Sequence, residues 1–232
     1  MKICFIQNDP IVVPGTILEW IEKNNHEVEI YKSYEEYNLP DTNDFDLAII
    51  LGGRMGAYEE KEYPALTKVK EWTKHNIDED KHILGICLGA QIIADVTGGE
   101  AKPHDKPEVG WYNVEFNEKV NSHHLLKNNV SNSKFYEFHF DSVELPEKAI
   151  LLGSSERTDN QIFAIGDKVL ATQFHPEFNI KSIEDALNHT NEEKAKMYYA
   201  QSVEEMKNDT YVENSKKWLF NILDNFESSI KN

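Results

Sequence analysis

The stretch Gly85-Ile86-Cys87-Leu88-Gly89-Ala90-Gln91 places a cysteine between two glycines. An apolar run at 82–84 precedes it, and an apolar, helix-like segment at 91–96 follows it. A nucleophile at the tip of a sharp strand-to-helix turn requires small residues two positions before and two after, because larger side chains would clash with the strained backbone. The N–H groups and dipole of the following helix would favour the thiolate of Cys87. The stretch therefore predicts a nucleophilic cysteine, although a small buried core residue fits the same pattern.

Strands and helices alternate around this stretch in the first half of the chain. We expect strands at 3–7, 28–31, 46–51 and 83–86, and helices beginning after Pro14-Gly15-Thr16 and near 66–72. This alternation predicts an α/β fold whose parallel sheet carries helices on both faces.

The pattern changes after Gly98-Gly99. Short strands are expected at 111–116, 135–140, 149–152, 161–165 and 169–174, with few helices between them, which indicates an antiparallel part of the sheet. From 180 to 226 the sequence is helical and charged, and two apolar stripes are expected to pack in the core: Tyr198, Val203 and Met206, then Trp218, Leu219, Ile222 and Leu223. We expect one domain over 1–232, with a core at about 1–178 and a C-terminal helical extension at about 179–232.

The composition limits the class of function. The 24 basic residues against 41 acidic residues give a net charge of −17, which argues against nucleic-acid and anionic-membrane partners. Two cysteines make no disulfide framework, and no spacing suggests a zinc site, so we expect neither metal nor cofactor. The absence of signal-like and membrane-spanning stretches predicts a cytoplasmic, reducing location that suits a catalytic thiol.

A candidate base follows the last expected strand, in Gln173-Phe174-His175-Pro176-Glu177. A histidine at a strand end can take the thiol proton and later return it to a leaving group, while a carboxylate two residues on fixes its tautomer. A surface turn is the ordinary explanation of such a motif taken alone. Together with Cys87, it predicts a catalytic set of Cys87, His175 and Glu177.

A glycine pair follows the expected strand 46–51, in Gly52-Gly53-Arg54-Met55-Gly56. Glycines at a strand end let backbone N–H groups approach a developing oxyanion without side-chain clash. We therefore expect the N–H groups of Gly53 and Leu88 to form an oxyanion hole, with Gly52 beside the substrate. An ordinary tight turn is the alternative.

Together, these motifs resemble the class I, or triad-type, glutamine amidotransferases, and in particular the branch similar to the amidotransferase half of GMP synthase. The resemblance extends from Met1 to about Glu177 and also includes Gly110-Trp111, His139-Phe140-Asp141-Ser142-Val143 and Asn160-Gln161. It implies a flavodoxin-like three-layer fold, Cys87 as nucleophile, His175 as base and acid, and Glu177 as the orienting carboxylate. It also implies that Gln91 contacts bound glutamine and that the loop of His139, Phe140 and Asp141 lines the pocket.

Two features depart from the family pattern. Arg54 stands where the family often has proline, which leaves backbone donation intact but changes the mouth of the site. The segment 180–208 is longer than the family core requires; of a lid, a dimer contact and an extra surface helix, we favour the last two.

Other residues are expected to be structural. His123 and His124 are expected in an exposed turn or helix start, with no further metal-ligating residues nearby. The charged run 59–62 is expected on a solvated surface. Trp111 and Cys4 are expected in the core.

Three functions remain open. The first is hydrolysis of the glutamine side-chain amide, with ammonia passed to a synthase on a separate polypeptide. The second is hydrolysis of another small γ-glutamyl compound, and the third is a catalytically silent subunit with a regulatory or binding role. Assembly as a homodimer is also open.

Overall fold

The computed structural model describes residues 1–35, 38–129, 133–189 and 196–231. These residues form a nine-stranded sheet in the order β2-β1-β3-β4-β9-β8-β7-β5-β6. The strands are β1 (Lys2–Gln7), β2 (Glu27–Lys32), β3 (Leu47–Ile50), β4 (His82–Ile86), β5 (Glu100–Phe116), β6 (Ser133–Glu144), β7 (Ala149–Ser154), β8 (Ile162–Ile165) and β9 (Val169–Thr172). The pairs from β2 to β9 are parallel, and those from β9 to β6 are antiparallel. The expected change from parallel to antiparallel pairing is confirmed.

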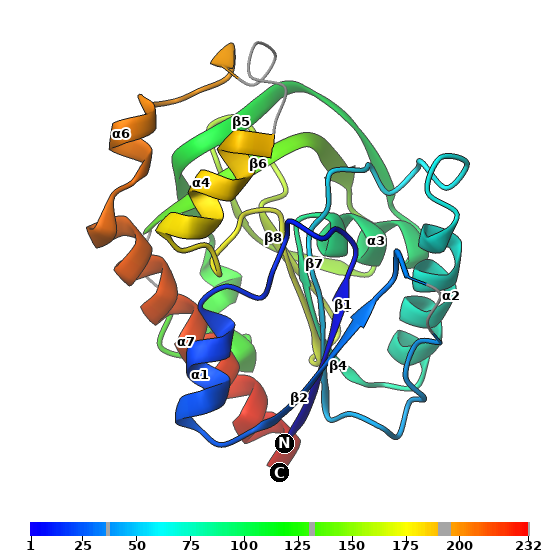
Figure 1. Cartoon of the computed structure of the whole chain (residues 1–232). Coiled ribbons are helices and arrows are strands. Elements are labelled where there is room, and N and C mark those ends of the chain that lie inside the picture. The colour runs from blue at the N-terminus through cyan, green and yellow to red at the C-terminus, as the bar shows by residue number, and fades with distance from the viewer. Residues whose placement is uncertain (36–37, 130–132, 190–195, 232) are drawn as a thin grey trace.

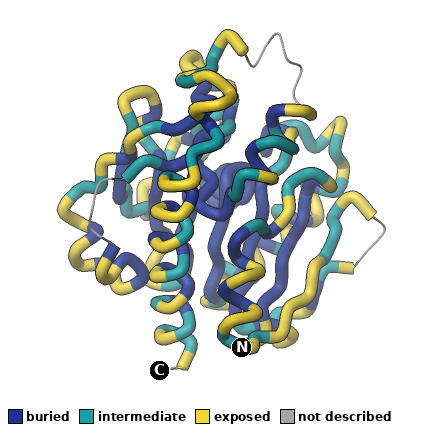
Figure 2. The backbone as a smooth tube through the Cα atoms, turned by 60° about the vertical axis from the view of Figure 1, so that its left-hand side comes forward, coloured by how far each residue is buried: buried dark blue, intermediate teal, exposed yellow. Residues whose placement is uncertain are grey.

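Helices cover both faces of the parallel half (Figure 1). One face carries α1 (Ile17–Lys23) and α7 (Asp209–Lys231), and the other carries α2 (Ala65–Asp78) and α3 (Leu88–Val96). The helices α4 (Ile180–His189) and α6 (Val203–Met206) pack instead with residues of β5 and β6, and 3-10 turns lie at Glu118–Asn121 and His124–Leu126. Alternate residues of β1 divide between two cores: Ile3 and Phe5 pack with α1 and α7, whereas Cys4 and Ile6 pack with α2 and α3. The central strands β1, β3, β4, β8 and β9 are consequently buried while the outer helix faces are exposed, as Figure 2 shows.

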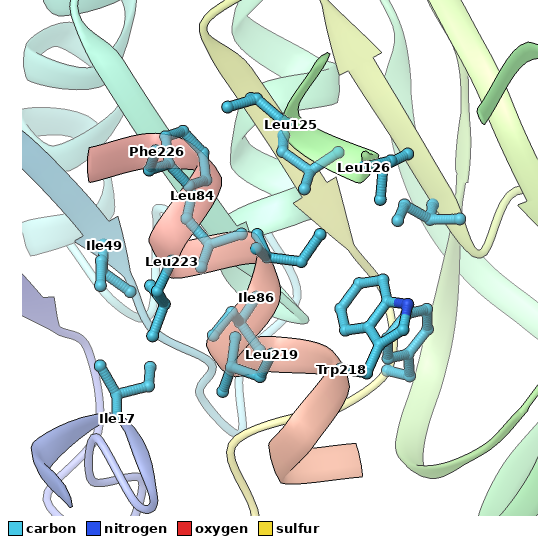
Figure 3. Packing of buried hydrophobic residues seen from close by; sticks show 14 of the residues in the cluster. Ile17, Ile49, Leu84, Ile86, Leu125, Leu126, Trp218, Leu219, Leu223 and Phe226 are labelled. Carbon is cyan, nitrogen blue, oxygen red and sulfur yellow. The ribbon is translucent and has the colours of Figure 1, made fainter. Parts of the chain in front are cut away.

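The long helix α7 belongs to the main core. Trp218, Leu219, Leu223 and Phe226 lie against Leu84 and Ile86 of β4 and other buried residues (Figure 3). The second expected C-terminal stripe is thus confirmed as core. Because α7 helps to bury the central strands, we propose that the described residues form a single domain with no separable extension.

The prediction that Tyr198, Val203 and Met206 form one apolar stripe along a helix is wrong. Tyr198 lies in a turn, and α6 begins only after Ser202, whose side chain and that of Glu205 form a reciprocal capping box. Met206 is buried, but Val203 is 42% exposed. Part of the segment 180–208, at 190–195, lies outside the described residues.

Two further expectations need correction. His123 is buried rather than exposed, and its Nε2 lies 3.2 Å from the carbonyl oxygen of Gly166. The strand expected at 111–116 begins at Glu100, because a polar segment without apolar alternation pairs with β6 across an irregularity between Pro103 and Glu108. The expected core positions of Trp111 and Cys4 are confirmed. Among the helices described, none is long and apolar enough to cross a membrane.

Candidate active site

Cys87 occupies the turn between β4 and α3 with φ 53° and ψ −108°, a conformation that non-glycine residues rarely adopt. Its two glycine neighbours are required sterically. A Cβ on Gly85 would lie 2.7 Å from the carbonyl oxygen of Gly89, and one on Gly89 would overlap the carbonyl of Ile50. The structure therefore shows the strained strand-to-helix turn that the sequence predicts, with Cys87 at its tip.

The start of α3 supplies an electropositive environment for the sulfur of Cys87. The first N–H groups of a helix have no intrahelical acceptor, and they carry the positive end of the helix dipole. Leu88, directly after Cys87, is the first residue of α3. This arrangement suits an oxygen that carries negative charge beside these N–H groups.

His175 and Glu177 lie on the turn after β9, both buried. His175 Nδ1 is 2.7 Å from Glu177 Oε1, and the His175 N–H donates to the carbonyl of Tyr136 at 2.8 Å. The Phe178 ring lies 4.1 Å from the imidazole ring between centroids. These contacts fix the orientation of the imidazole from both sides.

The protonated form of His175 is stabilised despite its burial. Burial alone disfavours the imidazolium, but the Glu177 carboxylate and the Cys87 sulfur, which also hydrogen-bonds to His175, outweigh it and raise the pKa of His175 to about 10. The site thus favours a proton on His175 beside the sulfur, which is the form needed to protonate a leaving group.

The start of α1 holds the main chain of Glu177. Thr16 donates from its backbone N–H, at 2.9 Å, and from its hydroxyl, at 3.2 Å, to the Glu177 carbonyl. Gly15, at φ +56°, packs so closely that a Cβ there would overlap the same carbonyl oxygen. Pro14-Gly15-Thr16, expected only to open a helix, therefore also positions the acid of the candidate triad.

The glycine pair lies against the side chains of His175 and Cys87. A Cβ on Gly52 would be 3.1 Å from His175 Cε1 and 3.4 Å from Cys87 Cβ, and one on Gly53 would be 2.8 Å from a methyl carbon of Leu88. Gly53 and Leu88, the two expected oxyanion donors, are thus neighbours beside Cys87.

Arg54 is held by a carboxylate that sequence reasoning missed. Asp9, after β1, accepts from Arg54 Nε at 2.5 Å, Nη2 at 3.0 Å and the Arg54 backbone N–H at 3.3 Å. Burial would raise the pKa of Asp9, but these bonds keep it below its usual value. The side chain of Asp9 is 2% exposed and that of Arg54 is 56% exposed, so a buried anion fixes an exposed cation at the site.

Gln91 lies one turn into α3 and is buried. Among the described residues, its side-chain oxygen has no hydrogen-bond partner. An unpaired buried acceptor is costly, so this oxygen suits a donor group of a bound ligand.

His139 is buried in a polar cluster with Glu108 and Glu137, two residues that sequence reasoning did not select. His139 Nε2 lies 3.2 Å from a carboxylate oxygen of each glutamate, and Nδ1 lies 2.8 Å from the Asp141 carbonyl. Burial disfavours its charged form, but the two glutamates raise the pKa of His139 to about 10. Burial also raises the pKa of Glu137, to about 7. Both ring nitrogens of His139 therefore face protein groups rather than a ligand.

The same cluster has the donor set of a metal site, since one atom from each of the three residues lies within 4.8 Å of the others. However, the Nδ1 proton is given to the Asp141 carbonyl, and the raised pKa of His139 favours a second proton on Nε2, between the two carboxylates. Metal binding would require loss of that proton, which the raised pKa of His139 opposes.

The prediction that His139, Phe140 and Asp141 form a pocket-lining loop is wrong, because these residues lie within β6 and do not line the cavity at Cys87. The Asp141 carboxylate accepts from the Tyr58 hydroxyl at 2.8 Å, and the ring of Phe140 lies 5.9 Å from that of Tyr198.

A cavity of about 100 Å³ opens at Cys87 and His175. Of the predicted site residues, only Cys87, His175 and Gly53 line it. The remaining lining residues are Asp9, Ile11, Val12, Val13, Arg54, Phe138, Phe178, Ser182, Ala186 and His189. Three of these belong to α4, so the described start of the segment 180–208 forms a wall of the cavity. The prediction that the segment 180–208 is merely an extra surface helix is therefore wrong for α4. Figure 1 shows this helix at the end of the molecule away from both termini.

The fold is thus a mixed α/β sheet in which a cysteine, a histidine and a buried carboxylate meet beside one cavity. The family model of the class-I glutamine amidotransferases matches residues 13–191, and the chain belongs to this family. The resemblance noted from the motifs is confirmed.

Three known proteins illustrate the similarity. The chain is 33% identical over 157 residues to a glutamine-hydrolyzing GMP synthase subunit of Methanosphaera stadtmanae, covering 63% of this chain and 77% of that protein. It is 32% identical over 149 residues to gamma-glutamyl peptidase 3 of Arabidopsis thaliana, covering 61% and 59%. A crystal structure of a glutamine amidotransferase from Thermotoga maritima matches with a TM-score of 0.88 over 97% of each chain at 23% identity, a likeness of fold.

Proposed function

We propose that this protein hydrolyses γ-glutamyl amides through a thioester on Cys87. The observation that carries the proposal is the assembly of Cys87, His175 and Glu177 from two turns far apart in the sequence. His175 is paired with Glu177 at 2.7 Å and hydrogen-bonded to Cys87, which lies at the start of a helix. A silent subunit would have no need for this arrangement.

In the proposed reaction, the Cys87 sulfur attacks the γ-carbonyl carbon of the substrate. The carbon–nitrogen bond breaks as His175 gives its proton to the leaving nitrogen. Water then attacks the γ-glutamyl thioester, His175 accepts a proton from that water, and the carbon–sulfur bond breaks to release glutamate and restore Cys87.

Other groups are assigned supporting roles. The N–H groups of Gly53 and Leu88 stabilise the oxyanion, with Gly52 against the reacting centre. Gln91 accepts a hydrogen bond from the glutamyl ammonium. His139 acts as a positioning residue that holds β6 against β5, because its nitrogens are already engaged by protein.

Two kinds of substrate fit this chemistry. Glutamine would release ammonia, and a separate synthase would then be the partner, as the name of the similar GMP synthase protein suggests. A γ-glutamyl compound with a larger leaving group is the second candidate. It is favoured by a cavity that continues beyond Cys87 and His175, and it agrees with the name of the similar gamma-glutamyl peptidase.

The test is glutamate release by purified protein from glutamine and from γ-glutamyl dipeptides. We expect release from at least one substrate, and none above background from Cys87→Ala. Cys4→Ala is the matched control, since Cys4 is the other cysteine and burial raises its pKa. Equal release by Cys87→Ala, or no release by the wild-type protein from any substrate, would contradict the proposal.

A further inference from the structure

The cavity at Cys87 extends into a space that ammonia, the leaving group of glutamine, does not need. One wall is the loop after β1, with Ile11, Val12 and Val13, and another carries the rings of Phe138 and Phe178. Side chains of α4 contribute a third wall. Apolar walls are stabilised by contact with an apolar ligand, and ammonia has no such part.

An arginine also lines this cavity, beside the polar side chains of Asp9, His175, Ser182 and His189. The sequence contains two arginines, Arg54 and Arg157, among 24 basic residues, and one of them lines the cavity. Asp9 uses two of the five side-chain N–H donors of Arg54, through Nε and Nη2. Arginine presents planar, paired donors that match a carboxylate.

Asp9 also fixes the direction of the guanidinium. Its carboxylate is buried and accepts from Ile11 N–H at 3.0 Å as well as from Arg54, so its own position is set by the main chain. An arginine held in this way loses little conformational freedom when it binds an anion, which strengthens binding.

We propose that this cavity binds the leaving group of a γ-glutamyl amino acid or peptide, and that Arg54 pairs with the carboxylate of that leaving group. The inference rests on the proposed function, because the same Cys87 and His175 perform the reaction. The bond from the γ-carbonyl carbon to the nitrogen of the second amino acid breaks, that nitrogen takes the proton of His175, and a free amino acid or peptide leaves. Asp9 acts as a positioning residue.

Three substrates separate the parts of this proposal: γ-glutamyl-alanine, γ-glutamyl-alaninamide, which lacks the leaving-group carboxylate, and glutamine. We expect Arg54→Gln to lower kcat/KM for γ-glutamyl-alanine by about 10- to 100-fold, the range for a hydrogen bond to a charged group. The values for the other two substrates should not change. Asp9→Asn should also lower kcat/KM for γ-glutamyl-alanine relative to kcat/KM for γ-glutamyl-alaninamide. Lys61→Gln removes the same charge from an exposed position outside the cavity and should leave all three values unchanged.

The outcomes that would overturn the inference are distinct from failure of the proposed function. An equal loss on all three substrates would place Arg54 at the glutamyl half, and no loss on any would remove it from binding. Activity of the wild-type protein on glutamine but not on either γ-glutamyl-alanine compound would overturn the leaving-group site alone. Inactivity of the wild-type protein on every substrate would overturn both proposals.

Discussion

Replacing Glu177 by glutamine tests how the site sets the proton on His175. The carboxylate lies 2.7 Å from Nδ1 with both residues buried, and its charge is the largest influence that raises the pKa of His175 to about 10. An opposite charge at this range shifts a pKa by about 1–3 units, or about 1.4–4 kcal/mol. Without the charge, only the Cys87 sulfur still opposes the effect of burial, so the pKa of His175 should fall by that amount.

The effect should appear in the pH profile of kcat/KM for glutamate release. Activity requires the proton on His175, so it should be lost as the pH rises through the pKa of His175, near pH 10 in the wild-type protein. In Glu177→Gln this alkaline limb should move about 1–3 units lower. The maximal rate should fall by about 10²–10⁴-fold, since the corresponding change in a serine protease triad costs about 10⁴.

A matched control is Glu227→Gln, which removes a carboxylate beside another histidine, His26, at 3.5 Å. This variant should keep the wild-type profile. Thermal unfolding of both variants separates loss of fold from loss of proton control. An unchanged alkaline limb and near-wild-type activity in folded Glu177→Gln would refute the assignment of Glu177 as the orienting carboxylate.

Three further changes test other parts of the structure. Gly15→Ala should lower the free energy of unfolding, measured with denaturant, by more than Gly166→Ala. Both glycines have positive φ, where a side chain costs about 1–2 kcal/mol, but only a Cβ on residue 15 would overlap the Glu177 carbonyl. Gln91→Leu should raise KM for glutamine while the fold is retained, because the buried oxygen proposed to accept from the substrate is lost; an unchanged KM would contradict that role. The raised pKa of His139 contributes stability that is complete below about pH 6.5 and lost as the pH rises through about 10. Accordingly, His139→Gln should lower the free energy of unfolding by about 3–5 kcal/mol near neutral pH. The variant should also lose less stability than the wild-type protein as the pH rises toward 10. The same slope of unfolding free energy against pH in the variant and the wild-type protein would contradict this account.

Local sequence rules predicted the catalytic turn well because its constraints are local. Only glycine fits two positions before and two positions after the strained Cys87, and the spacing between His175 and Glu177 is itself short. The alternation of strands and helices likewise predicted the parallel half of the sheet, since buried strands are continuous apolar runs.

The cluster of Glu108, Glu137 and His139 was not predicted because strand register assembles it. Glu108 lies opposite His139 in the β5–β6 pair, and Glu137 shares a strand face with His139. The available signal was Glu137 and His139 at alternate positions in the otherwise aromatic stretch 135–140. The third residue, Glu108, was not predicted because β5 is irregular just before it, and strand pairing across such an irregularity cannot be predicted from sequence spacing.

The contact between Asp9 and Arg54 was also missed, although a signal was present. Each follows one of two adjacent parallel strands, β1 and β3, whose carboxyl ends meet at one edge of the sheet. The place of α4 over the cavity had no comparable signal, since it depends on how the chain continues after Phe178.

The most direct test of the central claim is the intact mass of the protein acid-quenched during turnover of a γ-glutamyl substrate. We predict a population heavier by one glutamyl group, with the added mass on the peptide that contains Cys87 and absent from Cys87→Ala. The same added mass on another residue, or full turnover by Cys87→Ala without any adduct, would contradict thioester chemistry at Cys87.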